Sequence, residues 1–341
     1  MPEGFAQRVW ESSSITARIA REALRPASWA YAGVVAMRNL AYDHEWLRSA
    51  ELALPAISIG NLSVGGTGKT PVAAYVAARL AAQGLKPAIV MRGYGSDESL
   101  VHARLNPGIP VIVAADRVRG ALEARGAGRD VVVLDDAFQH RHARRDADIV
   151  LLSADLAGPV RSLPAGPWRE PLTSLARASL IAVTRKSASP VRARELLLHA
   201  RRFAPAAGGA VIHLAADCLV NWTSGEEAAL SSVGGRRVLA AAGIGDPRAF
   251  ASQLADAGAQ LELAAERDHH AYSAADAAAL ARRAEKNGML VCTLKDAVKL
   301  GPVWPRAAPP LWYLSQRVVV ESGASDLDGI LATISALKPA C

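Results

Sequence analysis

The residues best suited to chemistry in this 341-residue sequence form a short glycine-rich run, GGTGKT at 65–70. Glycines allow backbone N–H groups to turn inward around phosphate oxygens. Lys69 would reach the β- and γ-phosphates of a nucleotide, and the Thr70 hydroxyl would ligate Mg²⁺. The run therefore predicts a phosphate site for a nucleotide.

The segments on either side of this run fit the same interpretation. Residues 56–59 are an apolar strand, and a helix with one apolar face follows from Lys69 to Leu80. Strand, glycine turn and helix are the order that a P-loop requires, and the helix N-terminus adds its positive end. The strict P-loop pattern begins with glycine, whereas this chain has Ser63 at that position. The alternative interpretation is a glycine-rich turn that binds no ligand. The predicted nucleotide contacts are Ser63, Val64, Gly65, Gly66, Thr67, Gly68, Lys69 and Thr70.

A pair of aspartates follows a second apolar strand. Residues 130–134 end in Asp135 and Asp136, and Gln139 and His140 continue that loop. A carboxylate at the carboxyl end of a strand beside a P-loop is placed to hold Mg²⁺. Taken alone, such a pair is more often a helix N-cap; behind a P-loop, the metal interpretation is favoured.

The wider pattern alternates strands with Ala-rich helices. It predicts an α/β protein with a P-loop NTPase-type, doubly wound parallel sheet and a second, smaller α/β domain with its own parallel sheet. The Pro/Gly-rich stretch 163–170 is the expected boundary or hinge. We expect an N-terminal helical segment over 1–50, a P-loop domain over 51–172 and a C-terminal domain over 173–341.

The N-terminal segment has the pattern of an amphipathic helix. Over residues 5–25, apolar side chains such as Ile15 and Ile19 fall in one half of the helical wheel, and Arg18, Arg21 and Arg25 fall opposite. Pro26 ends the pattern, and an aromatic and apolar stretch follows. This composition is typical of an interfacial membrane anchor, while a helix packed on the protein's own core is an equal alternative.

Composition narrows the class of partner. The chain carries a formal net charge of +7, is 51% hydrophobic and only 5% aromatic. The charge favours an anionic partner, and the lack of basic runs interleaved with aromatics makes nucleic acid the weakest choice. The three cysteines are scattered without metal-ligand or redox spacing, which suits a reducing compartment. The early residues lack the continuous apolar core of a signal peptide.

Several longer motifs resemble one family, the tetraacyldisaccharide 4'-kinases of lipid A synthesis. They are GNLSVGGTGKTP, RGYG, SDE at 96–98, VLDDAFQH, LPAGPWRE, AGIGDP, DHHAY and TLKDAVK. The resemblance covers most of the chain, and the family also has serine at the first P-loop position. It implies transfer of the ATP γ-phosphate to the 4'-hydroxyl of a tetraacylated disaccharide 1-phosphate, with Mg²⁺, at the cytoplasmic face of the bacterial inner membrane.

The resemblance also implies roles for single residues. Asp97 matches the catalytic aspartate, His269 its partner, and Lys69 the P-loop lysine. The implied metal residues are Thr70, Asp135, Asp136 and Glu170, and Gln139 lies beside the nucleotide. The implied substrate contacts are Tyr94, Arg117, His140 and Arg169.

Two departures from the family pattern surround Asp97. The stretch between RGYG and the acidic motif is almost absent, and Ser96 replaces the usual glycine, so Glu98 is the substitute if the register slips by one. We expect Asp97 and His269 to come from different domains, so that domain closure assembles the base and excludes water.

Three other classes of protein compete with this interpretation. A P-loop ATPase of the partitioning or assembly class commonly has an additional early lysine, where this chain has Ser63 and Val64. A soluble small-molecule kinase would leave the N-terminal amphipathic segment unexplained. A non-enzymatic membrane-binding module would not turn over ATP.

Overall fold

The computed structural model describes residues 9–10, 12, 14–93, 97–156 and 158–337. The chain divides into two compact units. Unit 1 comprises Met1–Tyr94, His102–Leu214 and Val318–Cys341, and unit 2 comprises Gly95–Val101 and Ala215–Arg317. This division differs from the boundary expected at residue 172, because unit 1 continues to Leu214 and also includes Val318–Cys341.

Unit 1 is built on a largely parallel sheet. Its strands are β1 (Ala56–Asn61), β2 (Pro87–Met91), β3 (Val111–Val113), β4 (Val131–Asp135), β5 (Ala147–Ser153), β6 (Leu180–Arg185) and parts of β7 (Gly208–Asn221) and β12 (Leu311–Ser322). Their order is β12-β7-β6-β5-β1-β4-β2-β3. The central strand β1 pairs in parallel with both β4 and β5. The predicted parallel sheet is confirmed.

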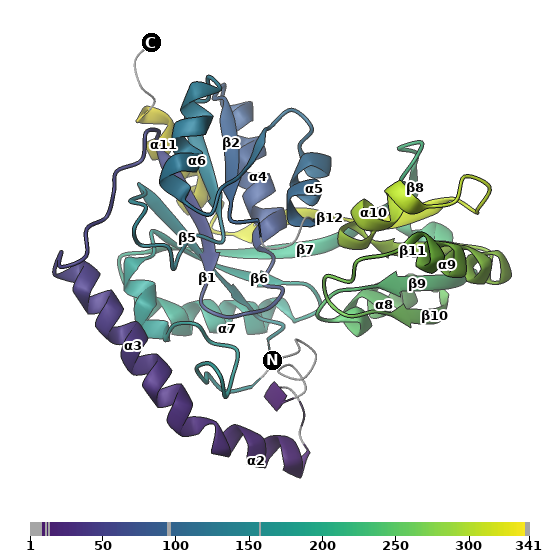
Figure 1. The fold of residues 1–341 in the computed structure, drawn as a ribbon, viewed down its shortest axis with the longest axis horizontal. Coiled ribbons are helices and arrows are strands. Elements are labelled where there is room, and N and C mark those ends of the chain that lie inside the picture. The colour runs from purple at the N-terminus through teal and green to yellow at the C-terminus, as the bar shows by residue number, and fades with distance from the viewer. Residues whose placement is uncertain (1–8, 11, 13, 94–96, 157, 338–341) are drawn as a thin grey trace. The chain divides into compact units, whose positions relative to one another are not determined.

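Helices cover both faces of the sheet of unit 1 (Figure 1). The strands are buried on both faces, so their apolar runs are continuous and successive side chains point to opposite sides. Ile57 and Ile59 pack with α4 (Lys69–Ala82) and α11 (Ala324–Ala336). Ala56 packs on the other face with α6 (Arg117–Gly126), and α7 (Pro190–Arg201) also packs on that face. The predicted double winding is confirmed.

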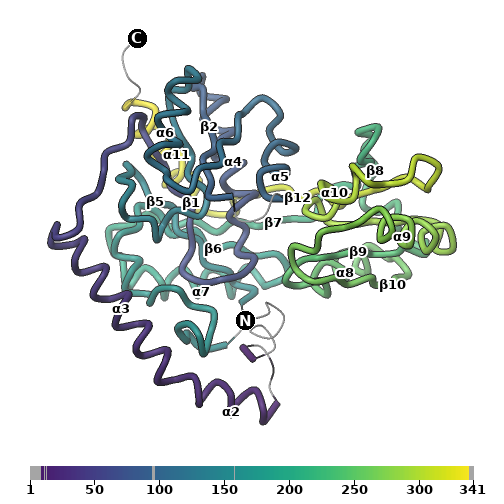
Figure 2. Tube along the Cα trace, in the orientation of Figure 1, coloured from purple at the N-terminus to yellow at the C-terminus, as the bar shows by residue number. Residues whose placement is uncertain are grey.

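The N-terminal segment forms two consecutive helices in unit 1, α2 (Ile15–Ala23) and α3 (Arg25–Asp43), which the Cα trace of Figure 2 shows one after the other. Ser14 caps α2 by accepting a hydrogen bond from the backbone N–H of Ala17, so the helix begins at residue 15. Pro26 ends the first pattern as expected, but it does so by starting α3, where proline is well tolerated. Most of the aromatic and apolar stretch is therefore helical.

Unit 2 contains β8 (Glu227–Ala229), β9 (Arg237–Ala242), β10 (Gln260–Ala265), β11 (Leu290–Thr293) and the other parts of β7 and β12. The order is β10-β9-β11-β12-β7, with β8 antiparallel to β7. Its helices are α8 (Pro247–Asp256), α9 (Ala274–Asn287) and α10 (Leu294–Leu300); α5 (Asp97–Leu105) begins in unit 2. Because β7 and β12 belong to both units, unit 2 does not build the separate sheet expected from the sequence.

Candidate functional site

The glycine-rich run connects β1 to α4, as the sequence predicts. Gly68 caps α4 with a left-handed backbone (φ 84°), and a side chain there would collide with Leu214. Only glycine fits this position without strain. The loop faces the end of β4, since Ile59 pairs with Asp135 across the sheet. The carboxyl ends of adjacent parallel strands therefore bring the glycine loop and the aspartate pair together.

Hydrogen bonds from side chains and backbone groups of neighbouring segments hold the glycine-rich loop in place. Asn61 Nδ2 donates to Thr67 Oγ1 at 2.7 Å, and Thr184 Oγ1 donates to the Thr67 carbonyl at 2.8 Å. The backbone N–H of Val64 donates to the Pro167 carbonyl at 2.7 Å. Thr67 is buried, whereas the two glycines before it are exposed. This arrangement presents a preorganised stretch of backbone to a ligand.

Asp136 lies opposite the P-loop lysine. Lys69 Nζ is 3.7 Å from Asp136 Oδ1, and Arg169 Nη1 donates to both carboxylate oxygens at 3.0 and 3.1 Å. Burial alone would raise the pKa of Asp136, but the charges on Lys69 and Arg169 outweigh it and lower the pKa. Asp136 also has a positive φ of 50°. Such strain in a residue other than glycine persists where the surroundings enforce it, often at a functional site.

Asp135 is buried beside a histidine that the sequence patterns do not single out. Asp135 Oδ2 lies 2.8 Å from His102 Nε2, and both side chains are almost fully buried. Asp135 Oδ1 is buried with no hydrogen-bond partner among the described residues. One carboxylate oxygen is thus held by the histidine, and the other remains available.

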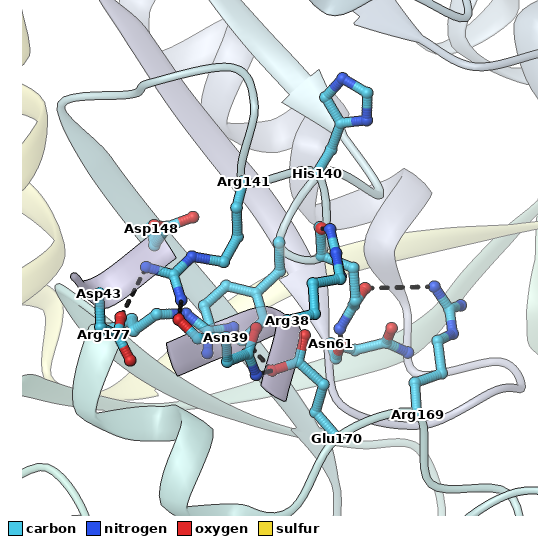
Figure 3. A network of polar contacts seen from close by, with 12 residues as sticks. Arg38, Asn39, Asp43, Asn61, His140, Arg141, Asp148, Arg169, Glu170 and Arg177 are labelled. Carbon is cyan, nitrogen blue, oxygen red and sulfur yellow. Dashed lines mark hydrogen bonds and ion pairs between the residues drawn. The ribbon is translucent and has the colours of Figure 1, made fainter. Parts of the chain in front are cut away.

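Arg169 and Glu170 follow the Pro/Gly-rich segment and belong to the polar network of Figure 3. The Arg169 backbone N–H donates to the Leu62 carbonyl at 2.7 Å, which ties the segment to the start of the phosphate loop. Gln139 Nε2 donates to the Asn61 carbonyl at 2.8 Å. Glu170 is 1% exposed, and its Oε1 has no hydrogen-bond partner among the described residues. These contacts place Gln139, Arg169 and Glu170 around the phosphate loop.

The oxygen ligands in this region fit Mg²⁺ bound together with phosphate. The predicted ligands are Thr70, Asp135, Asp136 and Glu170, and two of their carboxylates carry a buried oxygen without a partner among the described residues. Within those residues, no three His, Cys, Asp or Glu side chains converge as a metal cage. Mg²⁺ is usually held by one or two carboxylates, with waters and substrate phosphates completing its octahedron. The residues present are compatible with that mode.

A pair of a histidine and a carboxylate lies in unit 2. His269 Nδ1 is 2.9 Å from Asp97 Oδ2 and 3.1 Å from Oδ1, and His269 has a positive φ of 58°. The expectation that the two residues come from different domains does not hold, because Gly95–Val101 belongs to unit 2. Ion pairs explain this assignment: Lys299 lies 3.7 Å from Asp97, and Lys295 lies 3.6 Å from Glu98.

The charge state of this pair follows from its neighbours. Burial would raise the pKa of Asp97, but the hydrogen bond and charge of His269, with Lys295 and Lys299, lower it to about 2. The hydrogen bond to Asp97 raises the pKa of His269, against the effect of burial. The pair is therefore a carboxylate facing an imidazole whose protonated form is stabilised.

The residues expected to contact the acceptor substrate differ in their surroundings. Tyr94 lies outside the described residues. Arg117 is 1% exposed, and its guanidinium donates to the carbonyls of Ala114 and Asp135 at 2.8 and 3.2 Å, so it supports the loop after β4. His140 is partly buried, and burial followed by the charge of Arg117 lowers its pKa. Substrate contacts for these residues stay predictions.

Lys186 is a further cation near the loop that the sequence patterns do not single out. A Cβ on Gly66 would lie 3.8 Å from Lys186 Nζ. Lys186 directly follows β6, and the carboxyl ends of parallel strands form one edge of the sheet. A lysine at a strand end on that edge is the signal that could have identified it.

Comparisons with known proteins agree with this arrangement. The family described as tetraacyldisaccharide-1-P 4'-kinase matches residues 20–334. A tetraacyldisaccharide 4'-kinase of Anaeromyxobacter dehalogenans (strain 2CP-C) is 38% identical over 310 residues, which cover 82% of this chain and 81% of the relative. One of Syntrophus aciditrophicus (strain SB) is 36% identical over 329 residues, which cover 82% and 84%.

A solved structure has the same fold. The crystal structure of LpxK from Aquifex aeolicus in complex with ATP matches with a TM-score of 0.73 at 28% identity, covering 92% of this chain and 99% of that chain. The family match and the relatives span most of the chain, and the structural likeness extends over both units. The chain therefore belongs to the tetraacyldisaccharide 4'-kinase family.

Proposed function

We propose that this protein transfers the γ-phosphate of ATP to the 4'-hydroxyl of a tetraacylated disaccharide 1-phosphate. The observation that carries the proposal is the fixed phosphate loop whose lysine faces Asp136, in a chain that matches the kinase family over residues 20–334. The loop accounts for the nucleotide, and family membership supplies the acceptor.

On the nucleotide side, the site would position the β- and γ-phosphates and neutralise their negative charge. The exposed glycine amides and Lys69 would cradle the β- and γ-phosphates, where negative charge is redistributed during transfer. Thr70, Asp135, Asp136 and Glu170 would hold Mg²⁺, which when bound neutralises charge on the β- and γ-phosphate oxygens. Arg169 and Lys69 would keep the Asp136 carboxylate ionised and oriented.

On the acceptor side, Asp97 would take the proton of the 4'-hydroxyl as the new oxygen–phosphorus bond forms and the bond to the β-phosphate oxygen breaks. Its pKa of about 2 makes it a weak base. A weak base suffices where the transition state is loose. In such a transition state the bond between the hydroxyl oxygen and phosphorus has barely formed, so the hydroxyl does not have to be deprotonated beforehand. His269 would orient the carboxylate through its Nδ1 atom.

We also propose peripheral binding to the cytoplasmic leaflet of the inner membrane through α2 and α3. These helices carry exposed apolar side chains at Ile15, Ile19, Trp29, Val34, Met37 and Leu40. Arg18 and Arg25 are exposed beside them and would meet anionic headgroups. Within the described residues, no helix combines the length and the apolar character needed to cross a bilayer.

The test is a transfer assay with γ-labelled ATP and the purified lipid disaccharide 1-phosphate in mixed micelles. We expect label in the lipid with the wild-type protein and none above background with Lys69→Ala. ATP hydrolysis without labelled lipid would reject the acceptor. Equal labelling by the Lys69→Ala protein would reject this site as the nucleotide site.

A further inference from the structure

Helix α3 has two chemically distinct faces. Its inner face bears side chains that hydrogen-bond to the rest of unit 1, namely Ser28, Tyr31, Arg38 and Asn39. Its outer face bears the exposed apolar side chains Trp29, Val34, Met37 and Leu40. At 100° per residue these two sets fall on opposite sides of the helix, so both faces can act at once.

The inner face holds the segment that carries Arg169 and Glu170. Ser28 Oγ donates to the Ser162 carbonyl and accepts from the Ala165 N–H, both at 3.0 Å. Tyr31 Oη donates to the Arg169 carbonyl at 3.2 Å. These bonds from the first two turns of α3 fix the Pro/Gly-rich segment at both of its ends.

The next turns of α3 reach the buried carboxylate itself. Figure 3 shows Asn39 beside Glu170, with Nδ2 of the amide donating to Oε2 at 3.1 Å. Arg177 Nη2 donates to the same oxygen at 2.8 Å. Both donors thus act on Oε2, while Oε1 has no hydrogen-bond partner among the described residues. By donating to Oε2, the Asn39 amide therefore helps to leave Oε1 as the oxygen of Glu170 that remains available.

The same helix also contacts the loop after β4. Arg38 donates to the Gln139 carbonyl, and Arg141 donates to the Asn39 carbonyl at 2.9 Å and to Asp43 Oδ1 at 2.7 Å. Both loops that surround the phosphate site are consequently hydrogen-bonded to one helix.

We propose that Asn39 and Tyr31 are positioning residues for the phosphate and divalent-ion site, so that α3 sets the geometry of Glu170 and Arg169 with one face while the other contacts lipid. The inference rests on the proposed function for the identity of the ligands. Hydrogen-bond partners of metal-ligating groups typically contribute 10–100-fold in metal affinity or activity. A helix that only anchored the protein would need no such contacts.

The experiment compares adjacent positions on the two faces in the full-length protein. Asn39→Leu removes the amide but keeps a side chain with the same branching, Asn39→Asp places a second carboxylate against Glu170, and Leu40→Ser alters the outer face. Two readouts are used: the Mg²⁺ dependence of binding of a fluorescent, non-hydrolysable ATP analogue, and co-sedimentation with anionic phospholipid vesicles. Thermal melting checks folding, and Tyr31→Phe supplies an independent inner-face variant.

We expect Asn39→Leu and Tyr31→Phe to need about 10–100-fold more Mg²⁺ for nucleotide binding, while vesicle binding is unchanged. Asn39→Asp replaces the donor with a second acceptor, so its Mg²⁺ dependence should also differ from that of the wild-type protein. Leu40→Ser should show the reverse. Wild-type Mg²⁺ dependence in folded Asn39→Leu and Asn39→Asp would overturn the inference, as would equal loss of both readouts in Tyr31→Phe. Because nucleotide binding needs no acceptor, this result stands whether or not the lipid is phosphorylated.

Discussion

At the residue scale, the state of each candidate catalytic group is set by its charged partners. Asp136 lies between Lys69 and Arg169, and Asp97 lies between His269 and Lys299. In both cases opposite charges outweigh the effect of burial, so the carboxylates are ionised. Substitutions that remove one partner therefore change the electrostatics at the site in a predictable direction.

Replacing Lys69 with alanine should abolish transfer while leaving the fold intact. The Lys69 side chain is 15% exposed and its Nζ atom faces Asp136, and its reach to the β- and γ-phosphates is the reason for its position. We expect kcat to fall by at least about 10²-fold, as for loss of a single charge-stabilising donor. The measurement is kcat beside a thermal melt; a normal kcat would contradict the site, and a large drop in melting temperature would show a structural role.

Asp97 and His269 should act as a unit. Removing a general base typically costs about 10²–10⁴-fold in rate, so each alanine variant should lose kcat far more than nucleotide affinity. The Asp97→Ala/His269→Ala double variant should be little worse than either single variant, because groups that act together are non-additive. Fully additive losses would contradict a shared role, and a dead Glu98→Ala beside an active Asp97→Ala would move the base to the next residue.

Lys299 should tune the acid limb of the pH profile. Its charge helps to lower the pKa of Asp97 to about 2, below the ordinary value of 3.8, so the carboxylate form persists on acidification. Lys299→Met should raise this pKa and move the acid limb of kcat/KM to higher pH, because burial then acts against a weaker opposing charge. Lys286→Met, at an exposed lysine of α9, is the control. Identical profiles for both variants would refute the coupling.

At the scale of elements, the outer faces of α2 and α3 should control membrane binding. Ile19→Ser removes an apolar side chain that is 64% exposed, and Leu198→Ser on α7 removes one that is 68% exposed. Interfacial affinity scales with the apolar area that enters the lipid, so only Ile19→Ser should lower co-sedimentation with anionic vesicles and raise KM for the lipid. Equal effects of the two substitutions would show that exposed apolar surface in general, and not this helix, drives binding.

The sequence predicts the elements near the phosphate site well and the more distant partners poorly. The order of strand, glycine loop and helix at Lys69 is local, and β1 begins at Ala56, where the apolar run predicts. The patterns do not predict β10, whose side chains are mostly exposed, or the long strand β12. A strand at the end of a sheet carries polar side chains and so lacks a clear hydrophobic signal.

The partners of the site residues are missed for a related reason. His102 and Asn39 lie 33 and 131 positions from the carboxylates that they contact, so no local pattern contains the pair. A single histidine or asparagine in a helix is consistent with many environments, and only the tertiary structure shows which one holds.

At the scale of the whole molecule, the positive net charge of the protein should strengthen its binding to anionic membranes. With a formal net charge of +7, the protein should bind vesicles that contain anionic lipid more tightly than neutral ones. Raising the ionic strength from about 0.01 to 1 M shortens the Debye length from about 30 to 3 Å, so the preference should shrink with salt. A salt-independent preference would mean that apolar contact alone accounts for binding.

The position of the new phosphate tests the central claim most directly. The enzyme is given γ-labelled ATP with either the tetraacylated disaccharide 1-phosphate or its 4'-deoxy analogue, and the products are analysed by ³¹P NMR and mass spectrometry. The account predicts one added phosphate, at the 4'-oxygen, with the natural acceptor and none with the deoxy analogue. Phosphate at another position, or equal labelling of the deoxy analogue, would contradict it.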